Sequence, residues 1–238
     1  MTTTSTPVAV ITGAGQGLGR AVALRFIQSD ILPVLVGRTP AKLEAVQAEI
    51  EATGGKALIY TADVSDSAQV EQLRARLAAE FDHIDMLVNC AGESMILPLA
   101  ETNEDTWDHV LNMNLKAPYL MSRALLPMIH LSPNGSIINV VSKVALQGYA
   151  NVTAYSAAKT GLLGFTRSLA AELREAEIRV AAICPGPMDT PMRWNATPDF
   201  ERKVVISPDL VAESICQLVS LPRGVTAGEI LIQSMHYD

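Results

Sequence analysis

A glycine-rich stretch near the start of the chain, Thr12-Gly-Ala-Gly-Gln-Gly-Leu-Gly19, constrains the fold more than any other segment. A β-branched run precedes it, and Leu18, Val22 and Phe26 recur at helical spacing, which predicts a strand, a tight turn and a helix. Glycine permits positive φ angles and a close approach of the backbone to a ligand, and a helix N-terminus offers free N–H groups. The stretch therefore predicts a binding site for the phosphates of a nucleotide.

Strand and helix patterns alternate along the rest of the chain. Apolar runs predict strands at 8–11, 32–36, 57–61, 85–88, 136–141, 179–183 and 229–232, and helical spacing occurs at 18–26, 41–52, 68–80, 104–115, 117–131, 155–176 and 207–221. This rhythm predicts an α/β fold: a doubly wound (Rossmann) parallel seven-stranded sheet with helices on both faces, whose ligands bind at the carboxyl ends of the strands. With 238 residues and 49% hydrophobic content, a single domain over 1–238 accounts for the chain.

The composition argues against several classes of function. The net charge is −7 and no cluster of Lys and Arg is present, which excludes nucleic acid as an expected partner. Residues 1–7 lack the features of a signal peptide, and no apolar run approaches the ~18 residues of a membrane span, so we expect a cytoplasmic protein without a membrane partner. The three cysteines and four histidines have no ligand spacing, which predicts free thiols and no bound metal.

The end of the second predicted strand indicates which nucleotide binds. In dinucleotide-binding folds, an acidic residue about 20 positions after the glycines binds the 2′-hydroxyl of NAD, whereas an arginine nearby accommodates the 2′-phosphate of NADP. Here Gly37 is followed by Arg38 and Thr39. We therefore predict NADP(H), with NAD(H) as the weaker alternative. The competing interpretation of Arg38 is a solvated loop arginine.

A Tyr-x-x-x-Lys pair follows the fifth predicted strand. Tyr155 and Lys159 share one face of a helix, where an ammonium favours the phenolate and lowers the pKa of the phenol from about 10. That shift makes the tyrosine usable as an acid or a base. The segments Ser156-Ala-Ala-Lys159 and Lys159-Thr-Gly161 also match motifs of β-lactamase-type enzymes. They share one lysine and no S-D-N triplet is present, so a hydrolase is a distant alternative.

Together these motifs resemble the short-chain dehydrogenase/reductase family. Five motifs occur in order between Val8 and Ile232: Thr-Gly-x-x-x-Gly-x-Gly, Asp-Val, Asn-x-Ala-Gly, Ser with Tyr-x-x-x-Lys, and Pro-Gly-x-x-x-Thr. The resemblance implies hydride transfer between a nicotinamide and a carbonyl or secondary alcohol. In that mechanism Tyr155 donates the proton. Lys159 lowers the pKa of Tyr155 and also binds the ribose. Ser142 positions the carbonyl oxygen, and Asn114 holds a water in a proton relay.

The resemblance also implies where the cofactor lies. Asp63 and Val64 would bind the adenine ring, the Asn-x-Ala-Gly segment would pass close to a ribose, and Thr190 with the backbone before it would hold the nicotinamide amide. The predicted cofactor-binding residues are Gly13, Gly15, Gln16, Gly17, Leu18, Gly19, Arg38, Thr39, Asp63, Val64, Asn89, Ala91, Gly92, Tyr155, Lys159, Pro185, Gly186, Met188 and Thr190. The chain departs from the family at Cys90, at Gln16, where many NADP-dependent members are basic, and in its last residues.

The helix expected at 155–176 is apolar almost all round, which predicts a cover on its outer side. In the family that cover is a second subunit, so we expect a homodimer or a tetramer. Residues 187–208 are expected to form a short substrate lid. The sequence thus predicts an NADP(H)-dependent, carbonyl reductase-like oxidoreductase with a small-molecule carbonyl or alcohol substrate. The alternatives are a 3-oxoacyl-thioester (acyl carrier protein) reductase and a non-enzymatic NADP(H)-sensing module.

Overall fold

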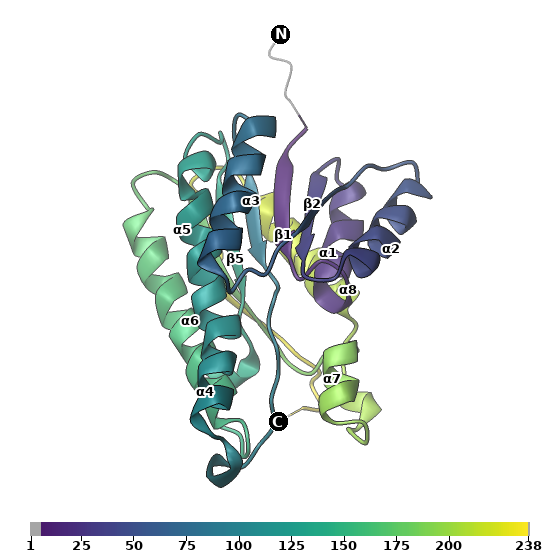
Figure 1. Cartoon of the computed structure of the whole chain (residues 1–238), viewed down its shortest axis with the longest axis vertical. Helices are drawn as coiled ribbons and strands as arrows, with labels where there is room; N and C mark the ends of the chain where they lie inside the picture. The colour runs from purple at the N-terminus through teal and green to yellow at the C-terminus, as the bar shows by residue number, and fades with distance from the viewer. Residues whose placement is uncertain (1–5, 238) are drawn as a thin grey trace.

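The computed structural model describes residues 6–237 and places seven strands in one parallel sheet (Figure 1). The strands are β1 (Val8–Thr12), β2 (Leu32–Gly37), β3 (Leu58–Thr61), β4 (Met86–Asn89), β5 (Ser136–Val140), β6 (Arg179–Pro185) and β7 (Glu229–Ile232). Their order in the sheet is β3-β2-β1-β4-β5-β6-β7, and it changes direction between β1 and β4. The predicted doubly wound α/β fold is confirmed. Residues 1–5 and Asp238, the ends of the predicted domain, lie outside the described residues.

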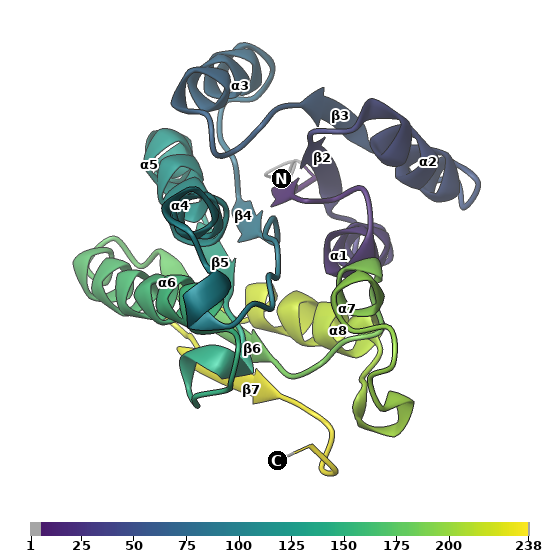
Figure 2. The ribbon, with the colours of Figure 1, turned by 60° about the horizontal axis from the view of Figure 1, so that its bottom comes forward.

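Helices cover both faces of the sheet (Figure 2). On one face, α1 (Gly17–Ile27), α2 (Pro40–Glu51) and α8 (Pro208–Val219) pack over side chains such as Ile11, Leu35 and Ile183. On the other face, α3 (Ser67–Glu80), α5 (Ala117–Ile129) and α6 (Thr153–Glu172) pack over the alternate residues, including Val10 and Val34. Because successive strand residues point to opposite faces, the apolar runs supply both cores at once.

The helical spacing at 104–115 and 117–131, which allows either one long helix or two consecutive ones, corresponds to two α-helices joined by a change of helical pitch. Here α4 (Glu104–Leu111) passes into a π-helical turn over Asn112–Lys116 and then into α5. Asn103 begins α4, and its side chain accepts a hydrogen bond from the N–H of Thr106 at 2.8 Å. The wider turn moves the side chains within it relative to a regular α-helix, and such turns are frequent at functional sites.

The segment after β6 contains more regular structure than its irregular sequence suggests. A short helix, α7 (Pro191–Ala196), begins directly after Thr190, and a 3₁₀ turn follows over Arg202–Val204. Pro191 stands at the first helical position, where its fixed φ angle and missing N–H are tolerated. Among residues 6–237, no helix has both the length and the hydropathy that a membrane crossing requires.

Candidate active site

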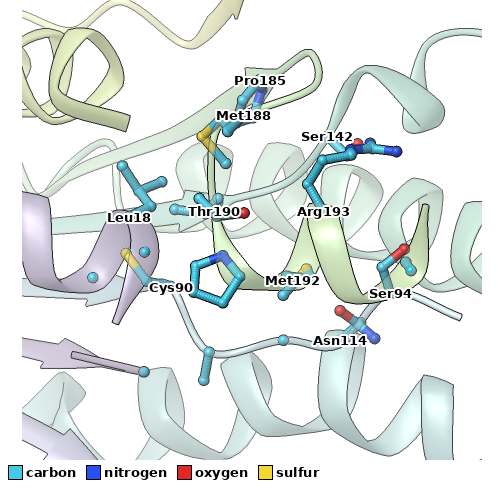
Figure 3. A pocket seen from close by; sticks show the side chains of 18 of the residues that line it. Leu18, Cys90, Ser94, Asn114, Ser142, Pro185, Met188, Thr190, Met192 and Arg193 are labelled. Atoms are coloured by element: carbon cyan, nitrogen blue, oxygen red, sulfur yellow. The ribbon is translucent and has the colours of Figure 1, made fainter. Parts of the chain in front are cut away.

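Nearly all of the predicted site residues line one pocket. It has a volume of about 440 Å³ and lies where β1, β4, β5 and β6 end; Figure 3 shows part of its lining, from Leu18 at the start of α1 to Asn114 and Ser142. The predicted residues that line it are Gly13, Gly15, Gln16, Gly17, Leu18, Gly19, Arg38, Thr39, Asp63, Val64, Ala91, Gly92, Asn114, Ser142, Tyr155, Lys159, Pro185, Gly186, Met188 and Thr190. Asn89 is the predicted residue that does not line it.

The glycine loop is held directly against the end of β4. Gly13 has a φ of +66°, and a Cβ placed on it would lie 2.9 Å from the Cα of Ala91. The N–H of Ala91 donates to the hydroxyl of Thr12 at 3.0 Å, which fixes this approach. Gln16 precedes α1 without a side-chain cap, so the first N–H groups of α1 are available to an anionic ligand.

Asn89 lies below the pocket wall instead of in it. Its side chain is 2% exposed, and its Nδ2 donates to Oδ1 of Asn139 at 2.8 Å. Asn139 in turn donates to the hydroxyl of Thr166 at 2.9 Å. Asn89 and Asn139 are direct neighbours in the sheet, so their side chains meet on the same face. This chain of hydrogen bonds links β4 and β5 to α6, which carries Tyr155 and Lys159.

Ser142, Tyr155 and Lys159 come together at the end of β5. Ser142 begins a 3₁₀ turn over Lys143–Ala145, where its hydroxyl accepts a hydrogen bond from the N–H of Val144 at 3.3 Å. The ammonium of Lys159 donates to the carbonyl of Val140 at 2.8 Å and lies 5.7 Å from the centre of the Tyr155 ring. The side chains that the sequence separates by 17 positions therefore share one end of the pocket.

Burial dominates the proton affinities at this end of the pocket. It lowers the pKa of Lys159 to about 8, because a buried ammonium loses its hydration. Burial also raises the pKa of Tyr155, while the hydroxyl of Ser142 and the charge of Arg193 act in the opposite direction. The net effect on the pKa of Tyr155 is thus upward, and the lowering of this pKa by Lys159 stays a prediction. Tyr155 is protonated at neutral pH, the form that a proton donor requires.

Asn114 approaches Lys159 across Gly92. It is fully buried in the π-helical turn, and its Nδ2 donates to the carbonyls of Glu93 at 2.9 Å and Val110 at 3.0 Å. A Cβ on Gly92 would lie 2.7 Å from Oδ1 of Asn114 and 3.6 Å from Nζ of Lys159. The glycine of the Asn-x-Ala-Gly motif thus leaves room for the amide and the ammonium to approach one another.

Two basic side chains flank the outer end of the glycine loop. Arg38 forms an ion pair with Glu93, and Glu93 also bonds to His109 at 2.8 Å. Lys42, on the first turn of α2, donates to Oε1 of Gln16 at 2.7 Å and also lines the pocket. An exposed ion pair contributes only about 0–1 kcal/mol, so an incoming anion competes readily for Arg38.

The end of β3 contributes Asp63 and Val64 to the same region of the pocket. Oδ1 of Asp63 accepts hydrogen bonds from the N–H of Ser65 at 2.9 Å and from its hydroxyl at 2.7 Å. These bonds fix the turn between β3 and α3, as expected for an Asp at such a position. They leave Oδ2 of Asp63 without a protein donor among the residues that the structure describes, so this oxygen remains available to a ligand.

The chain matches a known family along most of its length. Residues 7–201 match the family model described as short chain dehydrogenase. This chain belongs to the short-chain dehydrogenase family. A sepiapterin reductase of Chlorobaculum tepidum is 31% identical, with 97% of each chain covered. The 3-oxoacyl-(acyl-carrier-protein) reductase FabG of Thermotoga maritima is 32% identical, with 94% of each chain covered. A metagenomic short-chain oxidoreductase, solved with NADP, is 33% identical, with 96% of each chain covered and a TM-score of 0.84.

Membership of the short-chain dehydrogenase family confirms the resemblance and the class of reaction, oxidation and reduction at alcohol and carbonyl groups. Several pocket residues of this family member were not predicted from its sequence. Lys42, Lys143, Arg193 and Tyr237 all line the pocket. Lys42 was detectable, because it follows Arg38 by four residues at the start of a predicted helix. Lys143 directly follows Ser142, and Arg193 lies within the expected lid, so both were also detectable, whereas Tyr237 reaches the pocket only through a tertiary contact of the tail.

The buried lysine makes the stability of this short-chain dehydrogenase depend on pH. The pKa of Lys159 is about 8 in the folded chain and 10.5 as its ordinary value, so between these values the unfolded chain binds more protons. Below pH 8 the folded chain buries a charged Lys159 and bears the full free-energy penalty of doing so. As the pH rises from about 8 towards 10.5, Lys159 becomes neutral in the folded chain and this penalty decreases. We expect the free energy of unfolding of the wild type, relative to Lys159→Met, to increase from about pH 8 to about pH 10.

Urea denaturation without cofactor measures this difference. The exposed Lys56, changed to Met, serves as the matched control and should show no trend. A difference for Lys159→Met that stays flat or decreases with pH would contradict the lowered pKa.

Proposed function

We propose that this protein is an NADP(H)-dependent oxidoreductase that transfers a hydride between a nicotinamide and a carbonyl or secondary-alcohol substrate. The observation that carries the proposal is the pocket itself, which places the glycine loop and the Ser142, Tyr155 and Lys159 side chains in one cavity. The pocket thus offers a nucleotide end and, next to it, a proton donor with an adjacent cation. NADPH, when bound, supplies the hydride.

The residues of the pocket fit such a cofactor. A Cβ on Gly13 would strike the backbone of Ala91, so this floor of the pocket remains free of side chains where a pyrophosphate would bind. Arg38 and Lys42 supply positive charge beyond it, as a 2′-phosphate requires. The similar metagenomic oxidoreductase was solved in complex with NADP. The predicted cofactor contacts, including Asp63, Gly186 and Thr190, belong to this proposal.

The protein's own groups handle the proton. Tyr155 donates its phenolic proton to the carbonyl oxygen during reduction, and the hydroxyl of Ser142 holds that oxygen in place. Lys159 stabilises the resulting phenolate by its charge. Asn114, whose amide approaches Lys159 across Gly92, places the water through which a proton returns. Residues 187–208, which include α7, act as the lid that encloses the substrate.

Changing Arg38 to Ala tests the choice of cofactor. Loss of a charge-assisted contact to the 2′-phosphate should weaken NADPH binding by about tenfold or more and leave NADH binding nearly unchanged. Glu93→Gln should act in the opposite direction, because the carboxylate that competes for Arg38 is removed. Fluorescence titration of both nucleotides measures these affinities.

Arg74→Ala is the matched control, since Arg74 also pairs with a glutamate but lies on α3 outside the pocket. Equal affinities of the wild type for NADPH and NADH would contradict the assignment of Arg38 to the 2′-phosphate.

A second candidate function within the same chemistry is a 3-oxoacyl-thioester reductase. The similarity to FabG of Thermotoga maritima favours it. A carrier-protein partner would require a basic docking surface, whereas this chain has a net charge of −7. Reduction of acetoacetyl-CoA that is as efficient as that of free ketones would support this candidate.

We also propose a cytoplasmic homo-oligomer, a dimer or a tetramer. Tyr119 is 40% exposed and packs edge to face on Phe165 of α6, with ring centres 6.3 Å apart. Together with Leu115 these rings line a shallow groove beside α6 that a second copy of the chain would cover. Analytical ultracentrifugation tests this assembly, and a monomer at micromolar concentration would contradict it.

A further inference from the structure

The substrate end of the pocket holds two basic side chains that the proposed reaction does not use. Lys143 directly follows Ser142, and Arg193 lies on α7. Both line the pocket, and Figure 3 shows Arg193 extending from α7 in the direction of Ser142. The charge of Arg193 also acts on the phenol of Tyr155, so the guanidinium lies within electrostatic reach of the reacting end.

Neither side chain has an acidic partner within residues 6–237. Lys143 is 6% exposed, and its ammonium donates to the carbonyl of Tyr237 at 3.1 Å. Arg193 donates through Nη1 to the hydroxyl of Thr197 at 3.2 Å, and its Nε is buried without a hydrogen-bond partner. An ammonium has three donors and a guanidinium has five, so most of their donors remain for a ligand. Lys143 is buried and Arg193 is half-buried, and a buried cation without a counter-charge is unfavourable, so a bound anion would relieve that cost, chiefly for Lys143.

The pocket as a whole is positive although the chain is acidic. Its basic lining residues are Arg38, Lys42, Lys143, Lys159 and Arg193, whereas Asp63 is the acidic residue among the described lining side chains. Arg38, Lys42 and Asp63 lie at the nucleotide end, so the lining of the substrate end, within residues 6–237, combines three cations with no carboxylate. A concave site of one sign focuses its field and attracts ligands of opposite charge.

An aromatic ring lies against each of the two cations. Tyr237 stacks on Tyr149 and meets Phe200, with ring centres 6.1 Å and 6.2 Å apart. The guanidinium of Arg193 lies 4.6 Å from the centre of the Phe200 ring, and the ammonium of Lys143 lies 4.5 Å from that of Tyr237. Rings at these positions reduce the access of water, which strengthens a charge-assisted hydrogen bond to an anion.

We propose that this end of the pocket binds a carboxylate, so that the substrate is an oxo acid and the product the corresponding hydroxy acid. The planar guanidinium of Arg193 matches a carboxylate through two parallel hydrogen bonds, and Lys143 adds a point charge. The inference rests on the proposed reduction of a carbonyl group. The hydride of NADPH adds to the carbonyl carbon, the π bond breaks, and the oxygen takes the proton of Tyr155. The carboxylate is unchanged and NADP⁺ is released.

Paired substrates that differ only in charge test the inference. The probes are 4-oxopentanoate and 5-oxohexanoate, each compared with its methyl ester in NADPH-dependent reduction. For the wild type we expect kcat/KM for an acid to exceed that of its ester by about tenfold or more. Arg193→Met and Lys143→Met keep the apolar stem without the charge, so each should lower the ratio of kcat/KM for the acid to that for its ester by about tenfold.

Arg202→Met is the matched control. Arg202 also covers an aromatic ring of the same segment, at 4.2 Å from the centre of Trp194, but it is exposed and does not line the pocket. It should leave the preference for the acid intact.

The alternative is that Lys143 and Arg193 only hold the tail and α7 together. In that case Lys143→Met and Arg193→Met would impair acid and ester equally, which would overturn the inference. Esters reduced as well as acids would also overturn it, while the proposed function would stand. If neither is turned over, calorimetry on Tyr155→Phe loaded with NADPH decides: preferential binding of the acid that is lost with Arg193→Met supports the inference, and no preference overturns it. Failure to bind NADPH at all would instead contradict the proposed function.

Discussion

Changing Tyr155 to Phe is expected to lower kcat for NADPH-dependent carbonyl reduction by a factor of about 10² to 10⁴ and to leave NADPH affinity nearly unchanged. Phenylalanine keeps the ring beside Lys159 and removes only the hydroxyl that donates the proton. Burial raises the pKa of Tyr155, so the wild-type phenol carries its proton at neutral pH and is ready for reduction. Steady-state kinetics and fluorescence titration measure the two quantities.

Tyr119→Phe is the matched control for this variant, since Tyr119 lies on α5 outside the pocket and should keep full activity. Undiminished turnover of Tyr155→Phe would show that another group donates the proton. A parallel loss of NADPH binding would show that the hydroxyl maintains the pocket instead.

Changing Gly19 to Ala is expected to weaken NADPH binding by more than about 100-fold and to lower the free energy of unfolding by about 1–3 kcal/mol. A Cβ on Gly19 would lie 2.4 Å from the carbonyl oxygen of Gly13 and 2.8 Å from its carbon. Both are backbone atoms of the loop, so α1 and the loop must separate to admit one methyl group. The phosphate-binding N–H groups would then lose their arrangement.

Gly228→Ala is the control for that substitution, because a Cβ there meets no atom within 4 Å. It should change neither property. If Gly19→Ala bound NADPH as the wild type does, the glycine loop would not be the nucleotide site.

The fold and the centre of the site were predictable because local patterns determine them. Apolar runs of strand length, separated by helical spacing, allow few arrangements other than a parallel sheet. Tyr155 and Lys159 meet because four residues span one helical turn, and Ser142 joins them because β5 ends beside α6. Gly13 was predictable because its position requires a positive φ.

Other features depend on contacts between distant segments. Asn89 belongs to a segment that is expected to pass close to a ribose, which stays a prediction. The hydrogen bond between its side chain and Asn139 follows from the register of β4 and β5, which no single strand encodes. Lys143 reaches the carbonyl of Tyr237 only because the C-terminal tail returns over the pocket. The raised pKa of Tyr155 depends on how deeply α6 is buried, whereas the sequence shows only its neighbouring cation.

Deuterium transfer tests the central claim most directly. Two samples of NADPH are prepared, each deuterated at C4 of the nicotinamide in one of the two configurations. Each is incubated with the protein and a panel of free ketones, oxo acids, their esters and acetoacetyl-CoA. We predict that one of the two labelled cofactors delivers deuterium to the carbinol carbon of a product, as observed by mass spectrometry, and that Tyr155→Phe abolishes this transfer. Tight binding of NADPH with no deuterium in any product would contradict hydride transfer and would favour a protein that only senses the nucleotide.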